Sequence, residues 1–382
     1  MRLFQVLSAS ATGGVNSSKV WLRNLYEPLL DLGHDVYLFR AEEGALARTK
    51  RDSKLRTAFS TKLMDVFKME HSRQPFDLFF SYLMDGMVDT AVIDEIRKMG
   101  IPTCNFSCNN THQFGLVDEI SPHFDYNLHS EKDSADKFRQ IGANPVWFPM
   151  AANPRYYKPY NLTRTYDVTF VGQRYARRPS YIWHLLENGI SVDVFGPGWQ
   201  LSRHRLLGEV LRNISRYLLA LKATMATGDD TRADISARLA WLDFADRLRR
   251  KYQSHMHAPL SDDEMIQLYS KSRISLGFLE VYESHNPSAI VKQHLHLRDF
   301  EAPMCGALYL TGFCEELQDF YEPDNEVLVY RNDHEMLDKI RYYLANRSAA
   351  EKVRLAGRSR AQRDHSYQRR FEDLFSLMGY RK

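Results

Sequence analysis

The stretch YDVTFVGQRYARRPSYIWHLLENGISVDVFG, residues 166–196, decides the fold because it contains a complete strand–helix–strand unit. Residues 166–172 and 191–196 are short, apolar and rich in β-branched and aromatic side chains, which is typical of buried strands. Residues 177–189 between them have a helical pattern that ends at Gly189, and glycine is favoured at helix ends. Two strands joined through a helix pair in parallel, so this unit predicts an α/β domain.

The same alternation starts near the N-terminus and resumes after the quoted stretch. Further strand patterns lie at residues 3–8, 35–40, 76–82, 101–107, 124–129, 274–279, 307–311 and 326–330. The chain therefore predicts an α/β fold of two Rossmann-like, doubly wound domains that face a cleft, where such folds bind ligands. A loop-like segment rich in Pro, Asn and Tyr, residues 149–165, suits a linker. We place the first domain at residues 1–155 and the second at 156–365.

Residues 203–256 interrupt this alternation, because their pattern is almost all helical and contains no strand candidate. From residue 203 to residue 251 there are eleven Lys or Arg and six Asp or Glu, a net charge of +5. We interpret the segment as a helical insertion in the second domain. It either packs there as a hairpin or faces an anionic acceptor or membrane surface as a peripheral contact.

Composition excludes several classes of protein. The 382 residues are 44% hydrophobic and 26% charged, which is ordinary for a soluble globular chain. The net charge of +3 gives no reason to expect nucleic acid as a partner. No apolar run approaches the length that spans a bilayer, and the first residues do not resemble a signal peptide. The four cysteines form no CxxC pair, so a reduced, cytoplasmic protein is expected.

Five motifs in the right order resemble the GT-B glycosyltransferases, and in particular the CgeB-like glycosyltransferase family. They are GGVNSSKVWLRNLYEPLLDLGHDVYLF at 13–39, FDYNLHSEKDSADKFRQIGANPVWFPMAANPRYYKP at 124–159, the stretch from 166 to 199, RDFEAPMCGALYLT at 298–311 and the tail at 342–375. The resemblance covers nearly the whole chain except 203–256. It implies a sugar transfer from a nucleotide-diphosphate donor held by the second domain. It also implies that residues 366–382 form a helix that crosses back to the first domain.

In related enzymes with an E-A-x-x-C-G segment, the glutamate holds the ribose hydroxyls of the donor, and Glu301 stands in that register. A carboxylate suits this task because it can accept two hydrogen bonds from a vicinal diol. The alternative is a charge at a helix end. Arg298, three residues earlier on the same helical face, either pairs with Glu301 or points at the donor diphosphate. Gly306 suits the end of that helix, where φ is often positive.

Other donor-site candidates lie near strand ends. Arg174, Arg177 and Arg178 follow Gly172 just beyond a strand, where related transferases stabilise the leaving nucleoside diphosphate; the alternative is a solvated basic turn. Asn286 before Pro287 suits the start of a helix that would carry Lys292 and could cradle the diphosphate. Alternatively, the helix begins nearer Arg298. Gly13 and Gly14 follow the first strand, where small residues let the backbone approach a sugar or phosphate, or simply form a tight turn.

The catalytic base is expected in the first domain, and the candidates are His112, Asp85 and Asp118, with His112 preferred; a retaining enzyme would need no such base. No metal site is expected, because His294 and His296 would face different sides of a helix. The sequence therefore predicts a metal-independent glycosyltransferase of the hexosyltransferase type, without a cofactor. Its partners are a nucleotide-diphosphate sugar, with a UDP-sugar preferred, and a hydroxyl acceptor. A nucleotide-sugar epimerase of the same fold and a non-catalytic sugar-binding scaffold are the alternatives.

Overall fold

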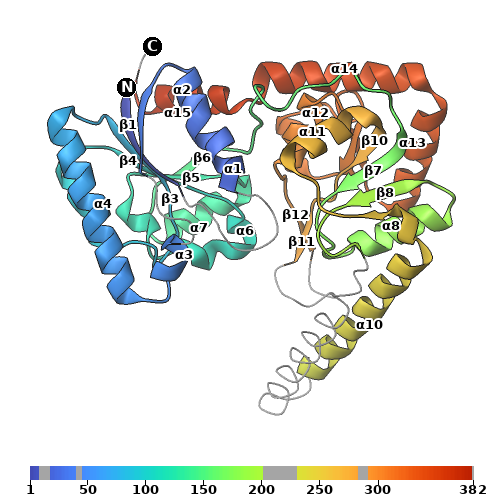
Figure 1. Cartoon of the computed structure of the whole chain (residues 1–382), viewed down its shortest axis with the longest axis horizontal. Coiled ribbons are helices and arrows are strands. Elements are labelled where there is room, and N and C mark those ends of the chain that lie inside the picture. Colours follow the sequence, from blue (N-terminus) through green and yellow to red (C-terminus); the bar gives the residue numbers. More distant parts are fainter. Residues whose placement is uncertain (8–17, 40–44, 201–229, 283–290, 381–382) are drawn as a thin grey trace. The chain divides into compact units, whose positions relative to one another are not determined.

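In the computed structural model the chain divides into two compact units (Figure 1). Unit 1 comprises Met1–Tyr156 and Gln362–Lys382, and unit 2 comprises Tyr157–Ala361. The structure describes residues 1–7, 18–39, 45–200, 230–282 and 291–380. Each unit is built on a six-stranded parallel sheet, which confirms the predicted α/β fold of two Rossmann-like domains.

The sheet of unit 1 has the strand order β2-β1-β3-β4-β5-β6, and every pair in it is parallel. Its central strands are buried from end to end, as expected for a sheet covered on both faces. The strands are β1 (Arg2–Leu7), β2 (Asp35–Phe39), β3 (Leu78–Tyr82), β4 (Thr103–Ser107), β5 (Tyr126–His129) and β6 (Pro145–Trp147). The sequence did not predict β6, a three-residue edge strand that contains Pro145.

An aromatic core holds the helices of unit 1 on this sheet. The ring of Phe4 on β1 lies 5.0 Å from that of Phe67 on α4 and 5.9 Å from that of Phe79 on β3. The α-helices are α1 (Ser18–Trp21), α2 (Glu27–Asp31), α3 (Ala45–Thr49), α4 (Ser53–Arg73), α5 (Thr90–Lys98), α6 (Asn110–Gln113), α7 (Ala135–Gln140) and α15 (Tyr367–Leu377). The last of these comes from the C-terminus, and its Phe371 packs against Phe80 and Phe148 of the same unit.

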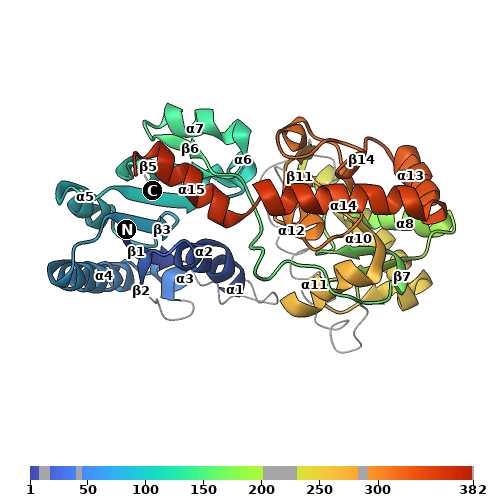
Figure 2. The ribbon, with the colours of Figure 1, turned by 90° about the horizontal axis from the view of Figure 1, so that it is seen from above.

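The sheet of unit 2 has the order β14-β13-β10-β7-β8-β9 and is also parallel. A separate antiparallel hairpin, β11 with β12, follows β10. The strands are β7 (Tyr166–Val171), β8 (Val192–Phe195), β9 (Met256–His257), β10 (Ser272–Leu276), β11 (Glu280–Tyr282), β12 (Val291–Gln293), β13 (Tyr309–Gly312) and β14 (Leu328–Tyr330). The α-helices are α8 (Arg178–Glu187), α10 (Asp230–Lys251), α11 (Asp262–Lys271), α12 (Arg298–Met304), α13 (Asp333–Ala345) and α14 (Arg347–Asp364). Figures 1 and 2 both show the long α14 beside α12.

Two sequence predictions for unit 2 are wrong in part. The segment 203–256 was expected to contain no strand, but its last residue, Met256, begins β9 and pairs with Val194 of β8. The rest of its described part is mainly α10, which packs on α8 through the rings of Phe244 and Trp183, 5.4 Å apart. Residues 203–229 lie outside the described residues. In the part of the chain that the structure describes, no helix is long and apolar enough to cross a membrane.

Of the two helix starts that the sequence left open, the one at Asn286 with Lys292 in the helix is wrong at its end, and the next helix, α12, begins at Arg298. Val291–Gln293 form β12, and Lys292 pairs with Val281 of β11. A β-branched residue such as Val291 favours extended backbone. The pattern of apolar and polar residues around it fits a strand as well as a helix. Asn286 itself lies outside the described residues.

Candidate functional site

The helix α12 brings Arg298 and Glu301 to the carboxyl end of β7. Arg298 donates a hydrogen bond from Nε to the carbonyl oxygen of Val171, the last residue of β7, at 3.0 Å. Its Nη1 donates to Oε2 of Glu301, also at 3.0 Å. Residues three apart on a helix share a face, so the predicted pairing of these two side chains is present. Because Arg298 also reaches the strand end where parallel sheets bind ligands, the pair lies where a ligand is expected.

Glu301 is a buried carboxylate, and burial raises its pKa, an effect that Arg298 and the Tyr157 hydroxyl oppose. A second buried tyrosine, Tyr269 of α11, interacts electrostatically with both Arg298 and Glu301. The Tyr269 hydroxyl has no hydrogen-bond partner among the described residues. Buried polar atoms are normally paired, so an unpaired hydroxyl beside a carboxylate and a guanidinium marks a place for a polar ligand atom. Neither tyrosine was predicted from the sequence.

Asp299 lies between Arg298 and Glu301 in sequence but has a structural role. Its carboxylate accepts hydrogen bonds from the hydroxyls of Tyr309 and Thr311, each at 3.1 Å, and from the backbone N–H of His296 at 2.7 Å. Tyr309 and Thr311 belong to β13, so these bonds fix the first turn of α12 on the sheet. Burial raises the pKa of Asp299 to about 6.

Arg178 adds a second guanidinium to the site. It begins α8 and donates from Nη1 to the carbonyl oxygen of Gln173 at 3.1 Å. Burial, and next the positive charge of Arg298, lower the pKa of Arg178 to about 10. Its Nε is buried and has no hydrogen-bond partner within the described part of the chain. Two cations that repel each other at a strand end favour a bound anion.

The neighbouring arginines of the basic turn are held by other contacts. The guanidinium of Arg174 lies 5.1 Å above the ring of Trp241 and 4.0 Å from the carboxylate of Asp246, both on α10. That of Arg177 lies 3.7 Å from Glu280. Gly172 is required by packing, because a Cβ there would come within 2.6 Å of the Phe170 ring.

The remaining residues predicted for the donor site fall into three groups: a helix end, a hairpin and residues outside the described ranges. Gly306 ends α12 with φ +74°, which confirms the predicted left-handed helix end. Lys292 is half-buried on the β11–β12 hairpin. Gly13 and Gly14, like Asn286, lie outside the described residues.

The two base candidates lie in unit 1, in segments that follow adjacent strands. Asp85 follows β3, and its carboxylate accepts hydrogen bonds from the backbone N–H groups of Ile120 at 2.8 Å and Glu119 at 3.3 Å. Burial raises the pKa of Asp85 to about 6, and hydrogen bonds from these two backbone groups oppose the rise. Asp85 also lines a hollow of about 200 Å³ with Arg56. His112 is half-buried on α6, which follows β4.

The prediction about His294 and His296 rested on a helix that is absent. Both residues follow β12 in an irregular segment, and their rings lie 4.4 Å apart in an edge-on contact. Within the described ranges no group of three or more His, Cys, Asp or Glu side chains is arranged to hold a metal ion.

Comparisons with known proteins agree with this architecture. The solved structures that match include a sucrose-phosphate synthase from Thermosynechococcus elongatus, at 13% identity and a TM-score of 0.61, covering 99% of this chain and 98% of that one. The HepE protein of Anabaena in complex with UDP matches at 11% identity and a TM-score of 0.59, covering 99% of both chains. AviGT4, a glycosyltransferase involved in avilamycin A biosynthesis, matches at 13% identity and a TM-score of 0.54, covering 98% of both chains. These likenesses show a shared GT-B fold.

Comparison of the sequence with family models shows which family the chain belongs to. No curated protein matches it. A model of the glycosyl transferase-like family matches residues 182–376, which is just over half of the 382-residue chain and includes Arg298, Glu301 and α14. The chain therefore belongs to the glycosyl transferase-like family.

Proposed function

We propose that this protein transfers a sugar from a UDP-sugar to a hydroxyl-bearing acceptor. The observation that carries the proposal is the convergence of Arg178, Arg298 and Glu301 at the carboxyl end of β7. A nucleoside diphosphate offers the complementary groups: two phosphates for the guanidiniums and a ribose diol for the carboxylate. The UDP complex of the structurally similar Anabaena protein supports uracil as the base.

Charge accounts for the chemistry at the donor side. The bond between sugar and diphosphate breaks with negative charge developing on the leaving phosphate, and fixed cations stabilise that charge. Arg178 and Arg298 are each already held by a backbone carbonyl oxygen, so they need little reorganisation when the charge appears. We propose no metal ion in this role, since the two guanidiniums can supply the positive charge.

The acceptor must lose a proton to become a good nucleophile. We propose His112 for this role, with Asp85 as the second candidate, because both oxygens of Asp85 already accept backbone N–H groups. The CgeB-like assignment is likewise a proposal, supported by the five sequence motifs. A cytoplasmic location is proposed because all four cysteines are free thiols, two of them buried.

The test is an assay of UDP release and of sugar products with a panel of UDP-sugars and simple hydroxyl acceptors. The proposal expects UDP to be released with the sugar attached to the acceptor or to water. A new UDP-sugar without UDP release would show an epimerase instead. Donor binding without any product would show a sugar-nucleotide-binding scaffold.

A further inference from the structure

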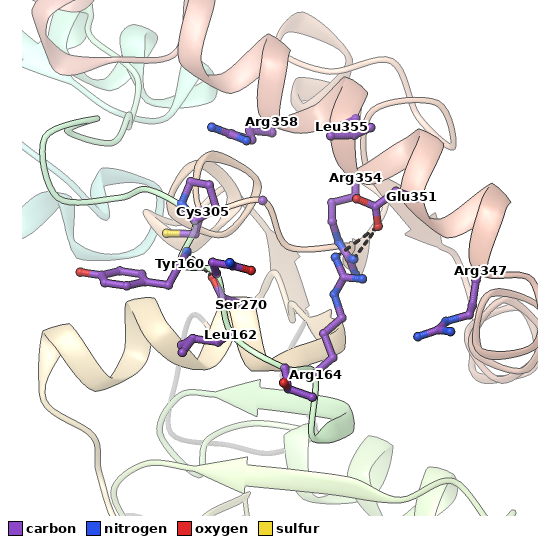
Figure 3. A pocket seen from close by; sticks show the side chains of 14 residues that line it. Tyr160, Leu162, Arg164, Ser270, Cys305, Arg347, Glu351, Arg354, Leu355 and Arg358 are labelled. Carbon is purple, nitrogen blue, oxygen red and sulfur yellow. Dashed lines mark hydrogen bonds and ion pairs between the residues drawn. The ribbon is translucent and has the colours of Figure 1, made fainter.

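A basic hollow lies in unit 2 between α14 and the segment that precedes β7. Figure 3 shows the side chains that line it. Its volume is about 430 Å³. Its charged lining consists of Arg164, Arg347, Arg354 and Arg358 against the single carboxylate of Glu351, a net charge of +3. The three helical arginines and Glu351 occur at spacings of four, three and four residues, so they share one face of α14.

Glu351 neutralises only part of this charge. Its Oε2 accepts one hydrogen bond from Nη1 of Arg354 at 3.0 Å and another from Nη2 of Arg164 at 3.2 Å. Figure 3 shows both arginine side chains converging on Glu351. Arg347 and Arg358 form no ion pair with any other described residue. Two guanidiniums of the hollow are therefore available to an anion.

Part of the positive charge in this hollow is buried, where water screens it less. Arg354 is only 5% exposed, and its Nε has no hydrogen-bond partner among the residues described. Burial, and then the positive charge of Arg164, lower the pKa of Arg354 to about 10. The Nε of Arg358 is also buried and unpartnered within the described ranges. A buried cation beside other positive charges raises the free energy of the empty site, and a bound anion would relieve that repulsion.

The uncharged walls indicate what the anion is attached to. Tyr160, Leu162 and Leu355 line the same hollow, and these side chains are 40%, 38% and 55% exposed. The volume of the hollow is larger than an inorganic ion needs. An anionic group with an apolar or flat organic part fits both kinds of wall.

We propose that this hollow binds a phosphomonoester, with the dianionic phosphate held by Arg358 beside the buried Arg354, one turn earlier on α14, and the organic part against the Tyr160–Leu162 wall. Guanidinium forks match phosphate oxygens geometrically, and a dianion offsets more of the +3 charge than a carboxylate does. The site is separate from Arg178, Arg298 and Glu301, and it does not depend on the proposed donor. It adjoins the end of α12, because Cys305 and Gly306 also line it.

The test is a calorimetric titration of the full chain with inorganic phosphate and with phenyl phosphate. We expect saturable binding at one site besides the proposed diphosphate site. The ester should bind there more tightly than inorganic phosphate. Arg358→Gln should weaken that binding about tenfold, which corresponds to one charge-assisted hydrogen bond. Arg347→Gln, three turns away along α14, should weaken it less. Lys352→Gln, an exposed charge on the same helix outside the hollow, and Arg178→Gln should leave it unchanged. Unfolding temperatures of all variants check that the fold is intact.

Sedimentation with vesicles of phosphatidic acid in phosphatidylcholine identifies the source of the phosphate. Cosedimentation that Arg358→Gln abolishes assigns the group to a lipid headgroup. Binding of phenyl phosphate without cosedimentation assigns the phosphate to a soluble ester. Absence of binding to all three probes would overturn the proposal. Equal losses in Lys352→Gln and Arg358→Gln would also overturn it, because they would show attraction by bulk charge alone.

Discussion

Arg298 ties helix α12 to strand β7 by donating a hydrogen bond from Nε to the carbonyl oxygen of Val171, 3.0 Å away and 127 residues earlier in the chain. The same guanidinium holds Glu301 through Nη1. One side chain therefore fixes a carboxylate and a positive charge together at the strand end. The first prediction follows from the second guanidinium at this place, that of Arg178.

Replacing Arg178 with glutamine should weaken UDP binding by about tenfold or more, because charge-assisted hydrogen bonds to phosphate are lost. Uridine binding should change little, since uridine has no phosphate. The ratio of UDP to uridine affinity, measured by calorimetry, isolates the diphosphate contribution. Arg174→Gln is the matched comparison, and it should alter the ratio less because Arg174 is engaged by Trp241 and Asp246. Equal ratios in wild type and Arg178→Gln would remove Arg178 from the site.

Asp299 should make the fold less stable as the pH rises. Its pKa in the folded state is about 6, above the ordinary value of 3.8, so the folded state binds the proton more tightly than the unfolded state. The stabilisation is complete below about pH 4 and is lost as the pH rises through about 6. Between pH 5 and pH 7 the wild type should lose roughly 1 kcal/mol more unfolding free energy than Asp299→Asn. Urea unfolding at the two pH values measures this difference, and parallel losses in the two proteins would contradict it.

His112→Gln should lower the turnover of UDP-sugar by about a hundredfold or more if His112 takes the acceptor proton. UDP affinity should be unchanged, because Arg178, Arg298 and Glu301 remain. Asp85→Asn is the comparison. If Asp85 is the base, the wild-type rate instead falls as the pH drops through about 6, because its protonated carboxyl accepts no proton, and Asp85→Asn shows the larger loss. Normal turnover in both variants would exclude both residues.

Gly357 lets α14 pack closely on the residues just before β14, because a Cβ there would overlap the carbonyl oxygen of Glu326. Backbone atoms cannot move aside like a flexible side chain, so Gly357→Ala should destabilise the protein by about 1–3 kcal/mol. Gly115→Ala, where an added Cβ meets no atom within 4 Å and φ is not positive, should have little effect. A thermal unfolding series compares the two, and equal unfolding temperatures would contradict the packing argument.

The fold could be predicted because its long parallel strands are continuous apolar runs. β3 and β4 are buried at every residue, and such runs with helices between them leave few alternative architectures. The short elements could not be predicted in this way. β6 and β9 have three and two residues, which is too few for any periodicity to emerge, and β12 was taken for part of a helix.

In the candidate site, contacts between residues close in the sequence could be predicted, and contacts between residues far apart in the sequence could not. Arg298 and Glu301 lie three residues apart, so their contact follows from helix geometry. Tyr157 comes from a loop-like segment that lacks any site signal, and the closeness of Arg178 to Arg298 depends on a strand end 127 residues before α12. The same reason hid the hollow on α14, since Arg164 is 187 residues from its partner Glu351.

The central claim is that unit 2 holds a nucleoside diphosphate through Glu301. The most direct measurement is a thermal-shift panel of UDP, GDP, TDP, ADP and CMP on wild type, Glu301→Ala and the exposed control Glu187→Gln. A ligand at a hundredfold its dissociation constant adds about 2.7 kcal/mol of stability, which such an assay detects. The account predicts that UDP stabilises wild type and Glu187→Gln but not Glu301→Ala. No response to any nucleotide, or an equal UDP response in all three proteins, would contradict it.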